Sequence, residues 1–258
     1  MTSDELPTGR LLSTQLSTQL TTQLSRQLSR RQALSLLGAS GIALLARPIA
    51  GHAAADPGAL PACVARPQQT AGPFFVDDAL DRSDVRSDPA SGEVVPGAAL
   101  RLTFRVSRLA GSDCAPLAGA RVDIWQCDAA GRYSDVRGWG SSSGQKFLRG
   151  FQTTDASGMA SFTTIYPGAY EGRAVHVHFK IRARSGAAAQ EFTSQLYFDD
   201  ALSDRVYSLA PYASVTPPRR MRNERDGLFN VNGRSLLLDV REAAGGFAST
   251  FDIGLQFA

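Results

Sequence analysis

The sequence has few of the residues that most often bind metal ions. Its 258 residues include only three histidines and three cysteines. No two cysteines form a close C-x-x-C pair, so a zinc site of the cysteine type is not expected. Long apolar runs are also missing, since the apolar stretch over residues 33–46 is shorter than the about 20 residues of a membrane-spanning helix. We therefore expect no stable membrane span in the mature protein.

An excess of charge is missing from most of the chain as well. The formal net charge of +3 arises within residues 1–55, where five arginines stand against two acidic side chains, and the rest of the chain is balanced. Binding to nucleic acid depends on a net or clustered positive charge, so a nucleic-acid partner is not expected. The apolar content of 43% and the charged content of 20% are ordinary for a globular protein.

The N-terminal segment has the features of an export leader. Residues 12–31 repeat a polar four-residue unit around leucines, which cannot form a core by itself. Paired arginines and a short apolar stretch follow in "SRRQALSLLGASGIALLA", residues 29–46, and small residues then suit cleavage near residues 53–55. The arginine pair resembles a twin-arginine signal, with a general secretion signal as the alternative. We expect an exported, periplasmic or secreted protein that uses the twin-arginine (Tat) export machinery, with a leader over residues 1–55 and one domain over residues 56–258.

Export allows a disulfide bond among Cys63, Cys114 and Cys127. The odd number leaves one cysteine over or shared between molecules, and the sequence does not fix the pairing. We favour Cys114–Cys127, which would fasten the turn before the strand predicted at residues 121–127.

The pattern beyond residue 56 is that of an all-β protein. Short segments with alternating apolar and polar residues are separated by turns rich in glycine, proline and aspartate. The predicted strands cover residues 99–109, 121–127, 148–154, 159–166, 174–183, 191–198, 235–240 and 250–257. Residues 199–226 are expected to hold one short helix. Regularly spaced short strands favour an antiparallel β-sandwich with long active-site loops, preceded by a signal peptide.

Two of the three histidines stand one residue apart in the strongest strand pattern, "AVHVHFKIRA". Residues i and i+2 of a strand point to the same face, so His176 and His178 project together, about 7 Å apart at their Cα atoms. Two such imidazoles can bind one metal ion. The alternative is a pair of polar residues on the solvent face of an amphipathic strand.

Two tyrosines lie where they could complete such a site. Tyr133 ends the turn that follows the strand at 121–127, and Tyr170 follows a Pro-Gly turn six residues before His176. A phenolate is a hard anionic ligand that suits Fe(III), whose charge lowers the pKa of the phenol. The alternative for each tyrosine is a packed or interfacial aromatic residue.

Four sequence segments carry a family resemblance. They are "TAGPFFVDD" (70–78), "VDIWQCDAAGRYSDV" (122–136), "FLRGFQTTDASG" (147–158) and "TIYPGAYEGRAVHVHFKI" (164–181). In this order and spacing they resemble the motifs of the intradiol ring-cleavage dioxygenases, the family of protocatechuate 3,4-dioxygenases and catechol 1,2-dioxygenases, and the chain is similar to the exported branch of that family. The resemblance covers roughly residues 63–200.

The resemblance implies a non-haem Fe(III) cofactor held by Tyr133, Tyr170, His176 and His178 on a β-sandwich. Tyr166 precedes the Pro-Gly turn and does not match the motif. The implied substrates are a catechol and O₂, and the implied product is a cis,cis-muconate. The catechol would chelate the iron, which acts as a Lewis acid, while Tyr170 leaves the metal and accepts a proton.

The resemblance also assigns two residues to the surroundings of the substrate. Arg173 matches a family arginine whose positive charge would favour the bound catecholate. Gln195 matches a glutamine near the same pocket. The alternatives are a plain surface arginine and a structural strand residue. The expected catalytic residues are therefore Tyr170, Arg173 and Gln195.

Two other functions remain open at this stage. One is an exported β-sandwich binding module without catalytic iron, and the other is a copper or zinc site that uses the H-x-H pair. Metal analysis would separate them from the dioxygenase. The sequence does not identify the catechol, and it leaves the oligomeric state open, so a homo-oligomer is possible.

Overall fold

The computed structural model describes residues 64–111, 113–136, 142–186, 188–216 and 220–257. The predicted leader, residues 1–55, lies outside these ranges, and so does Cys63. Within the described ranges, no helix has the length and apolar character needed to cross a membrane. The description below concerns only the domain predicted over residues 56–258.

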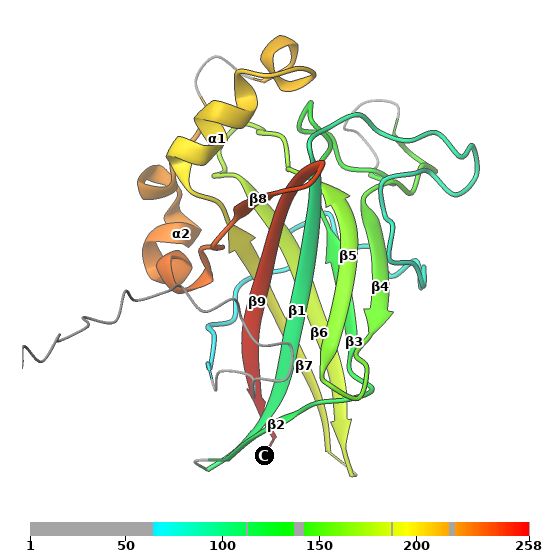
Figure 1. Ribbon diagram of the computed structural model, residues 1–258, viewed down its shortest axis with the longest axis vertical. Helices are drawn as coiled ribbons and strands as arrows, with labels where there is room; N and C mark the ends of the chain where they lie inside the picture. Colours follow the sequence, from blue (N-terminus) through cyan, green and yellow to red (C-terminus); the bar gives the residue numbers. More distant parts are fainter. Residues whose placement is uncertain (1–63, 112, 137–141, 187, 217–219, 258) are drawn as a thin grey trace, which may run out of the picture. The chain divides into compact units, whose positions relative to one another are not determined.

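The described part of this domain is mostly β-strand, in two sheets (Figure 1). The first sheet contains β1 (Ala99–Ala110), β2 (Asp113–Pro116), β5 (Met159–Ile165), β8 (Arg241–Ala243) and β9 (Gly246–Gln256). β5 pairs with the first part of β1, and β2 pairs with its last part. β9 lies between β1 and β8 and pairs with both. The expected all-β class is confirmed.

The second sheet carries the histidines. Its strands are β3 (Arg121–Trp125), β4 (Arg149–Thr153), β6 (His176–Ser185) and β7 (Ala188–Tyr197). They lie in the order β4-β3-β6-β7, and all of the pairs are antiparallel. Each of the predicted strands that formed this sheet is found within a few residues of its expected bounds.

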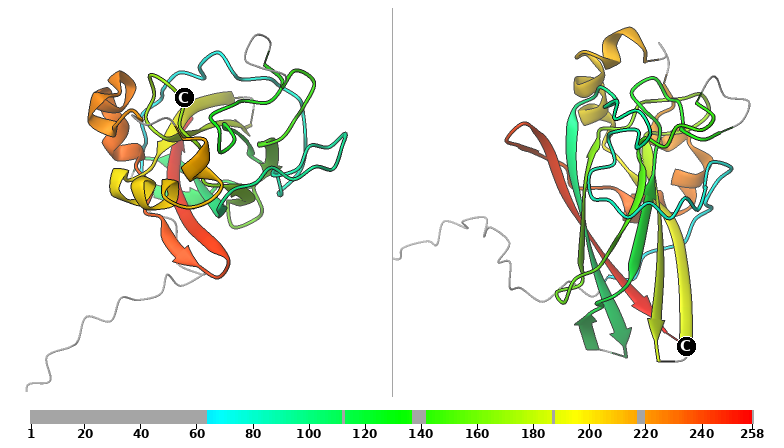
Figure 2. Two further views of the ribbon diagram at one scale, coloured as in Figure 1. Left: turned by 90° about the horizontal axis from the view of Figure 1, so that it is seen from above. Right: turned by 90° about the vertical axis from the view of Figure 1, so that its right-hand side faces the viewer.

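The inner faces of the two sheets meet in an apolar core (Figure 2). The Phe104 ring on β1 lies 5.2 Å from the Phe179 ring on β6, and Phe251 on β9 lies 5.6 Å from Phe179. Phe104 and Phe179 are fully buried. Alternation along β6 sends Val177 and Phe179 into this core, so His176 and His178 face the opposite side of the sheet.

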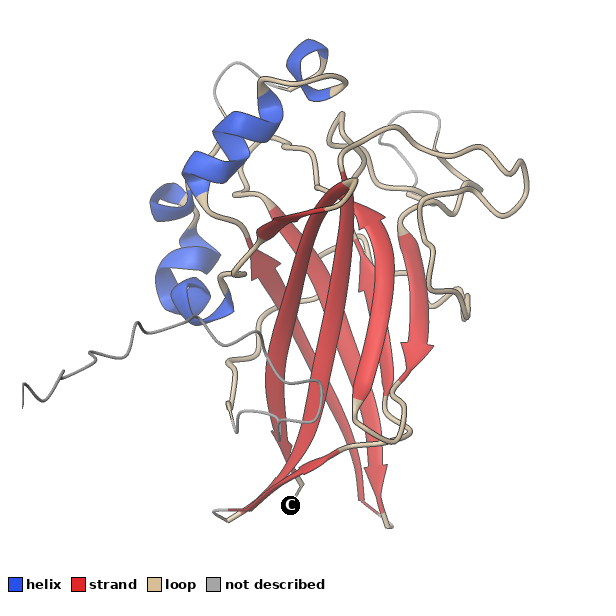
Figure 3. Ribbon diagram, in the orientation of Figure 1, coloured by secondary structure: helices blue, strands red, loops and turns tan. Residues whose placement is uncertain are grey.

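Helical segments between β7 and β8 gather on one side of the sheets (Figure 3). They are α1 (Asp200–Tyr207), α2 (Gly227–Asn232) and the 3₁₀ helices η1 (Tyr212–Ser214), η2 (Asn223–Arg225) and η3 (Gly233–Leu236). The side chain of Asp199 caps α1 by accepting the N–H of Leu202, and Asp226 caps α2 in the same way. The helix predicted within residues 199–226 is confirmed as α1.

Three expectations about the strands are wrong. The strand predicted at 235–240 is replaced by η3 and a single bridge at Leu237, because a short apolar run packs equally well in either form. The tight turn at 155–158 predicts that the segments at 148–154 and 159–166 pair as a hairpin; both are strands, but β4 and β5 belong to different sheets. The sheets are not wholly antiparallel, since β1 and β9 pair in parallel. These two strands are far apart in the chain, so no tight turn forces them to be antiparallel.

The predicted disulfide Cys114–Cys127 is also wrong. Cys127 is a buried free thiol, whereas Cys114 is disulfide-bonded. Cys114 lies on β2, and Cys127 follows the far end of β3. The seven residues from Arg121 to Cys127, of which Arg121–Trp125 form β3, span about 20 Å when extended, while the Cα atoms of a disulfide lie within about 7 Å of each other.

Candidate metal centre

The two histidines are buried on the outer face of the second sheet. His176 and His178 are exposed by only 2% and 1%, which excludes the interpretation that they are polar residues on a solvent face. A segment that we call the arm, residues 67–78, covers them from outside. A Cβ atom at Gly72 of the arm would lie 3.3 Å from Cε1 of His178. The histidines therefore occupy a closed layer between sheet and arm.

The strand register fixes what stands beside His178. Its Cα partners are Trp125 on β3 and Gln195 on β7. The Trp125 indole stacks on the His178 ring with centroids 5.0 Å apart and planes within 5°. Because β6 is a central strand, both neighbours are held by ladder hydrogen bonds, and the stacked indole of Trp125 fixes the plane of the imidazole from one side.

Tyr133 reaches the histidines from the loop after β3. The Asp128 carboxylate shapes the preceding turn by accepting the N–H groups of Ala130 and Arg132, both at 2.9 Å. This turn directs the Tyr133 ring inward, where it is 1% exposed. The ring of Phe74 in the arm stacks on it with centroids 4.4 Å apart.

Tyr170 approaches the same point from the loop between β5 and β6. Its ring is half-buried and lies edge-on to the Tyr133 ring, with centroids 5.8 Å apart. Tyr166, the tyrosine before the Pro-Gly turn, points elsewhere, and its hydroxyl lies 2.7 Å from Ser203 Oγ on α1. The structure therefore brings Tyr133 and Tyr170 together and leaves Tyr166 apart.

Three polar atoms converge on His176 Nε2 and form a cluster of four with it. The hydroxyl oxygens of Tyr170 and Tyr133 lie 3.2 and 3.4 Å from it, and Nε2 of His178 lies at 3.1 Å. Ligands bound about 2 Å from one metal ion lie roughly 3 Å from each other. The three distances to His176 Nε2 are those expected between ligands of one metal ion.

Hydrogen bonding alone does not account for this cluster. His176 Nδ1 lies 2.6 Å from the carbonyl oxygen of Ala174, to which it donates, so Nε2 carries a single in-plane lone pair. Two phenols and one imidazole stand around that lone pair, and only one of them can donate to it well. A cation at the centre would instead use the lone pairs of all four groups. The donor set therefore fits a metal ion.

Burial sets the protonation states of the four groups. It lowers the pKa of His176 to about 3 and the pKa of His178 well below its usual range, so both imidazoles are neutral and able to bind a metal. Burial also raises the pKa of Tyr170 to about 12 and holds the pKa of Tyr133 well above its usual value, so both phenols need a neighbouring cation to ionise. Within the described ranges, no three His, Cys, Asp or Glu side chains form a metal cluster, so the tyrosines are essential to this set.

Arg173 and Gln195 meet beside the cluster. Nη2 of Arg173 donates to Oε1 of Gln195 at 2.6 Å, and Nε2 of Gln195 donates to the carbonyl oxygen of Thr70 in the arm at 3.1 Å. Nε of Arg173 donates to Oδ2 of Asp226 at 2.9 Å. The charge of Arg173 also opposes the rise that burial causes in the pKa of Tyr170. Arg173 is thus an oriented cation rather than a plain surface arginine.

Comparison with known proteins agrees with this geometry. A family model described as "Dioxygenase" matches residues 70–224. An intradiol ring-cleavage dioxygenase from Tetranychus urticae is similar in structure, with a TM-score of 0.64 and 29% identity, covering 75% of this chain and 95% of that one. The dioxygenase domain of a fusion with a carbohydrate-binding protein from Streptomyces sp. SirexAA-E has a TM-score of 0.55 and 31% identity, covering 76% of this chain and all of that domain.

The chain belongs to the intradiol ring-cleavage dioxygenase family.

A curated relative gives the same family at greater distance. Catechol 1,2-dioxygenase 1 from Acinetobacter lwoffii is 27% identical over 176 residues, which cover 59% of this chain and 52% of that protein. The chain therefore spans about half the length of this relative. The family resemblance expected from the sequence motifs is confirmed.

The arm of this intradiol dioxygenase was visible in the sequence only as a motif, and its contacts were not predicted. Phe75 packs on Trp125 with ring centroids 4.8 Å apart, and the ammonium of Lys180 lies 4.6 Å from the centre of the Phe75 ring. Asp77 pairs with Arg121 and Arg182 at 2.9 and 2.7 Å. Aromatic stacking and ion pairs thus hold the arm to the outer face of the sheet.

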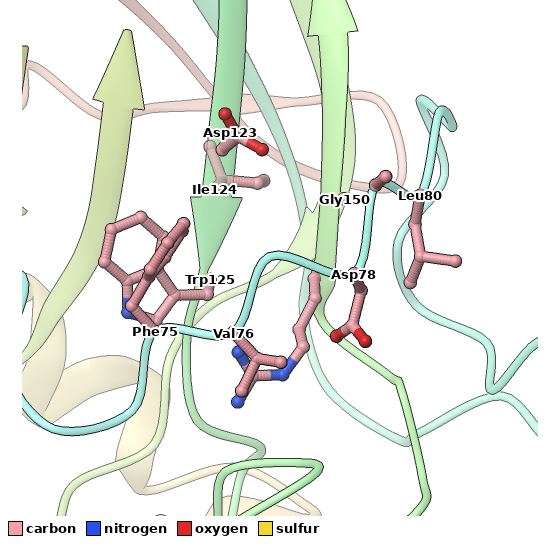
Figure 4. A pocket seen from close by; sticks show the side chains of 10 residues that line it. Phe75, Val76, Asp78, Leu80, Asp123, Ile124, Trp125 and Gly150 are labelled. Carbon is pink, nitrogen blue, oxygen red and sulfur yellow. The ribbon is translucent and has the colours of Figure 1, made fainter. Parts of the chain in front are cut away.

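A small pocket lies under the arm beside Trp125 (Figure 4). Phe75, Val76 and Asp78 from the arm face Asp123 and Trp125 from β3 across it. None of the four residues of the cluster lines this pocket. It therefore belongs to the contact between arm and sheet, not to the metal centre.

Arg149 is another functional residue that the sequence did not single out. Its buried guanidinium donates to the carbonyl oxygen of Phe74 at 2.8 Å and to the hydroxyl of Ser134 at 2.9 Å. Phe74 stacks on the Tyr133 ring, and Ser134 is the residue that follows Tyr133 in the chain. Arg149 therefore holds Tyr133 from both sides, through contacts that no local sequence pattern could have revealed.

Proposed function

We propose that this chain is a non-haem Fe(III) dioxygenase that cleaves a catechol between its two hydroxyl groups with O₂, giving a cis,cis-muconate-type product. The observation that carries the proposal is the convergence of Tyr133, Tyr170 and His178 on Nε2 of His176 at 3.1 to 3.4 Å. Membership of the intradiol family supports it independently.

The donor set favours iron over the alternatives. Two phenolates and two neutral imidazoles suit Fe(III), a hard cation, better than copper or zinc, for which tyrosinate is an unusual partner. Tyr133, Tyr170, His176 and His178 would hold the ion, which supplies Lewis-acid activation of a bound catecholate toward O₂. A binding module without metal has no need of two phenols and an imidazole gathered around the lone pair of a buried histidine.

The surroundings of the two tyrosines give them different roles. Both lie in loops, but Tyr133 is fully buried and stacked on Phe74, while Tyr170 is half-buried. If both tyrosines hold the ion, Tyr170 would be the one whose side chain turns away when the substrate binds. Its high pKa makes the released phenolate a strong base for the proton of the catechol. Tyr133 keeps its place.

Arg173 supplies a fixed positive charge beside this site. Its guanidinium is held by Gln195 and Asp226, so no reorganisation is needed as negative charge builds up on the substrate. Gln195 is assigned the role of fixing Arg173 and, through Thr70, the arm.

The experiment is an absorption spectrum of the leader-free protein with its iron content, before and after anaerobic addition of catechol. We expect a broad visible band from charge transfer between tyrosinate and Fe(III), and we expect catechol to shift it. A protein that stays colourless after reconstitution with iron would overturn the proposal. Metal analysis that finds stoichiometric copper or zinc instead would favour the H-x-H alternative.

Three tyrosine variants sharpen this test. Tyr133→Phe and Tyr170→Phe each remove one hydroxyl from the cluster and should each change the band. Tyr166→Phe is the matched control, since its hydroxyl contacts Ser203 and lies outside the cluster. The control should keep the band, the iron content and the catechol shift.

We further propose export through the twin-arginine route, which rests on the leader and is supported by the disulfide of Cys114. In a bacterial host with that pathway, the double variant Arg30→Lys, Arg31→Lys should stay in the cytoplasm. Arg26→Lys, in the repeat before the signal, should be exported as the wild type is. Export of the double variant would favour a general secretion signal.

A further inference from the structure

Asp226 lies at the junction of the metal centre and α2. Its side chain is 1% exposed, and its two carboxylate oxygens accept four hydrogen bonds. Oδ2 accepts Nε of Arg173 at 2.9 Å and the backbone N–H of Ala174 at 2.8 Å. Oδ1 accepts the backbone N–H groups of Leu228 and Phe229 at 2.8 and 3.2 Å. The Asp226 carboxylate thus binds Arg173 and caps the start of α2 at the same time.

The contact extends to a candidate ligand. The carbonyl oxygen of Ala174 accepts Nδ1 of His176 at 2.6 Å, so the backbone segment that Asp226 holds also orients the imidazole. Asp226 lies beyond residues 70–224, where the family model matches. Its role is therefore inferred from the contacts in this chain.

We propose that Asp226 is a positioning residue for the reaction, which aims the guanidinium of Arg173 at the bound catechol. This inference rests on the proposed function, because it needs a catechol beside Arg173. The hydrogen bonds of the Asp226 carboxylate go to Arg173, Ala174, Leu228 and Phe229. Its effect on the substrate passes through Arg173.

The arrangement of donors makes the carboxylate difficult to replace. An amide in the Asp226→Asn variant has one oxygen and one NH₂ group. If the oxygen faces Leu228 and Phe229, the NH₂ group faces the donors of Arg173 and Ala174. If the amide is flipped, the NH₂ group faces the N–H groups of the helix. Asp226→Asn therefore loses either the helix cap or the anchor of the arginine.

Asp226→Ser separates these two functions. Serine is a good N-cap residue, so it keeps the start of α2. Its short side chain leaves Arg173 without a carboxylate. If Asp226→Asn fails to fold, Asp226→Ser still tests the anchor.

The first measurement needs no iron. In the metal-free protein, the Nε–H proton of Arg173 is observed by NMR and assigned with an Arg173→Gln variant. We expect a sharp, slowly exchanging resonance in the wild type that is lost in Asp226→Ser. A resonance that exchanges rapidly in the wild type would overturn the inference, because Arg173 would then not be held.

The second measurement is anaerobic binding of catechol to the iron-loaded proteins, followed by the visible band. Asp226→Ser should keep the band of the resting protein and bind catechol about tenfold more weakly or worse. Thr154→Val is the matched control, because it removes buried hydrogen bonds to Leu117 and Ala120 at the far end of β3. It should lose stability and keep the affinity for catechol.

A double-mutant cycle then shows whether Asp226 acts through Arg173. In an Arg173→Gln background, Asp226→Ser should change catechol affinity by less than about twofold. An equal loss in both backgrounds, or no loss in the wild-type background, would overturn the inference alone. A wild-type protein that lacks the band or its catechol shift would overturn the proposed function, and the inference with it.

Discussion

The backbone N–H of Gly168 donates to the carbonyl oxygen of Asp128 at 3.2 Å, and this contact joins the two loops that carry Tyr133 and Tyr170. A Cβ atom at Gly168 would lie 2.2 Å from the same oxygen. Gly131, in the other loop, is packed in the same way, since its Cβ would lie 2.5 Å from the carbonyl oxygen of Ala169. The backbone of neither loop can shift without disturbing the other, whereas the side chain of Tyr170 can still rotate.

Gly168→Ala should therefore disrupt the metal centre as a whole. The added methyl group forces the two loops apart, at a cost of about 1–3 kcal/mol in the free energy of unfolding. We expect a large loss of bound iron and of the visible band, measured after reconstitution. Gly172→Ala is the control: Gly172 has a φ of +82°, but a Cβ there meets nothing within 4 Å, so it should cost only backbone strain. A Gly168→Ala protein that binds iron as the wild type does would contradict this account.

The buried histidines should make the iron-free protein sensitive to acid. The pKa of His176 is about 3 in the folded protein, against about 6.5 in an unfolded chain, and that of His178 is also lowered by burial. At a pH between the folded and the unfolded pKa values, the unfolded chain binds more protons than the folded protein. The free energy of unfolding therefore rises with pH, by at most about 1.4 kcal/mol per pH unit for each histidine.

Urea unfolding of the iron-free protein between about pH 5 and 6.5 measures this slope above the range in which most carboxylates titrate. The double variant His176→Gln, His178→Gln should show a clearly flatter dependence. An equal slope in the wild type and the variant would mean that the histidines are not neutral in the folded protein.

Two contacts of the arm should differ greatly in their contribution to stability. Arg149→Met leaves the carbonyl oxygen of Phe74 and the hydroxyl of Ser134 without their buried donor, which should cost about 3 kcal/mol. Asp77→Asn breaks ion pairs whose carboxylate is 46% exposed, and should cost less than about 1 kcal/mol. Chemical denaturation of the two variants gives the comparison. The reverse order would show that ion pairs, not Arg149, hold the arm.

Cys127 should be chemically silent in the folded protein. Burial, with the neighbouring charge of Asp128, raises the pKa of its thiol, and the sulfur donates to the carbonyl oxygen of Gly168. We expect no reaction with a thiol reagent at pH 8 until denaturant is added. Peptide mapping without reduction should then find Cys127 alkylated and Cys114 in a disulfide. Recovery of Cys127 in a disulfide peptide would contradict the structure.

The local part of the site could be predicted from the sequence because it depends on short-range geometry. The period of a strand places His176 and His178 on one face, and turn residues locate Tyr133 and Tyr170. That the pair is buried could not be predicted, since an outward-facing strand residue is covered only if another segment crosses it. Here that segment is the arm, which the sequence marked as a motif without its contacts.

The parts that the sequence missed depend on contacts between distant residues. Asp226 reaches Arg173 across 53 positions, and Arg149 reaches Phe74 across 75. The wrong disulfide has the same origin, because Cys114 and Cys127 are near in sequence but are separated by the length of β3. Nearness along the chain is a poor guide wherever an extended strand intervenes.

The parallel pairing of β1 with β9 has a consequence for how the protein is made. The register runs from Leu100↔Phe247 to Leu109↔Gln256. The first strand among the described residues therefore pairs with the last one. While the ribosome is still adding β9, the edge of β1 is unpaired and open to aggregation. Native structure forms only after synthesis of β9, through contacts of high sequence separation that close slowly.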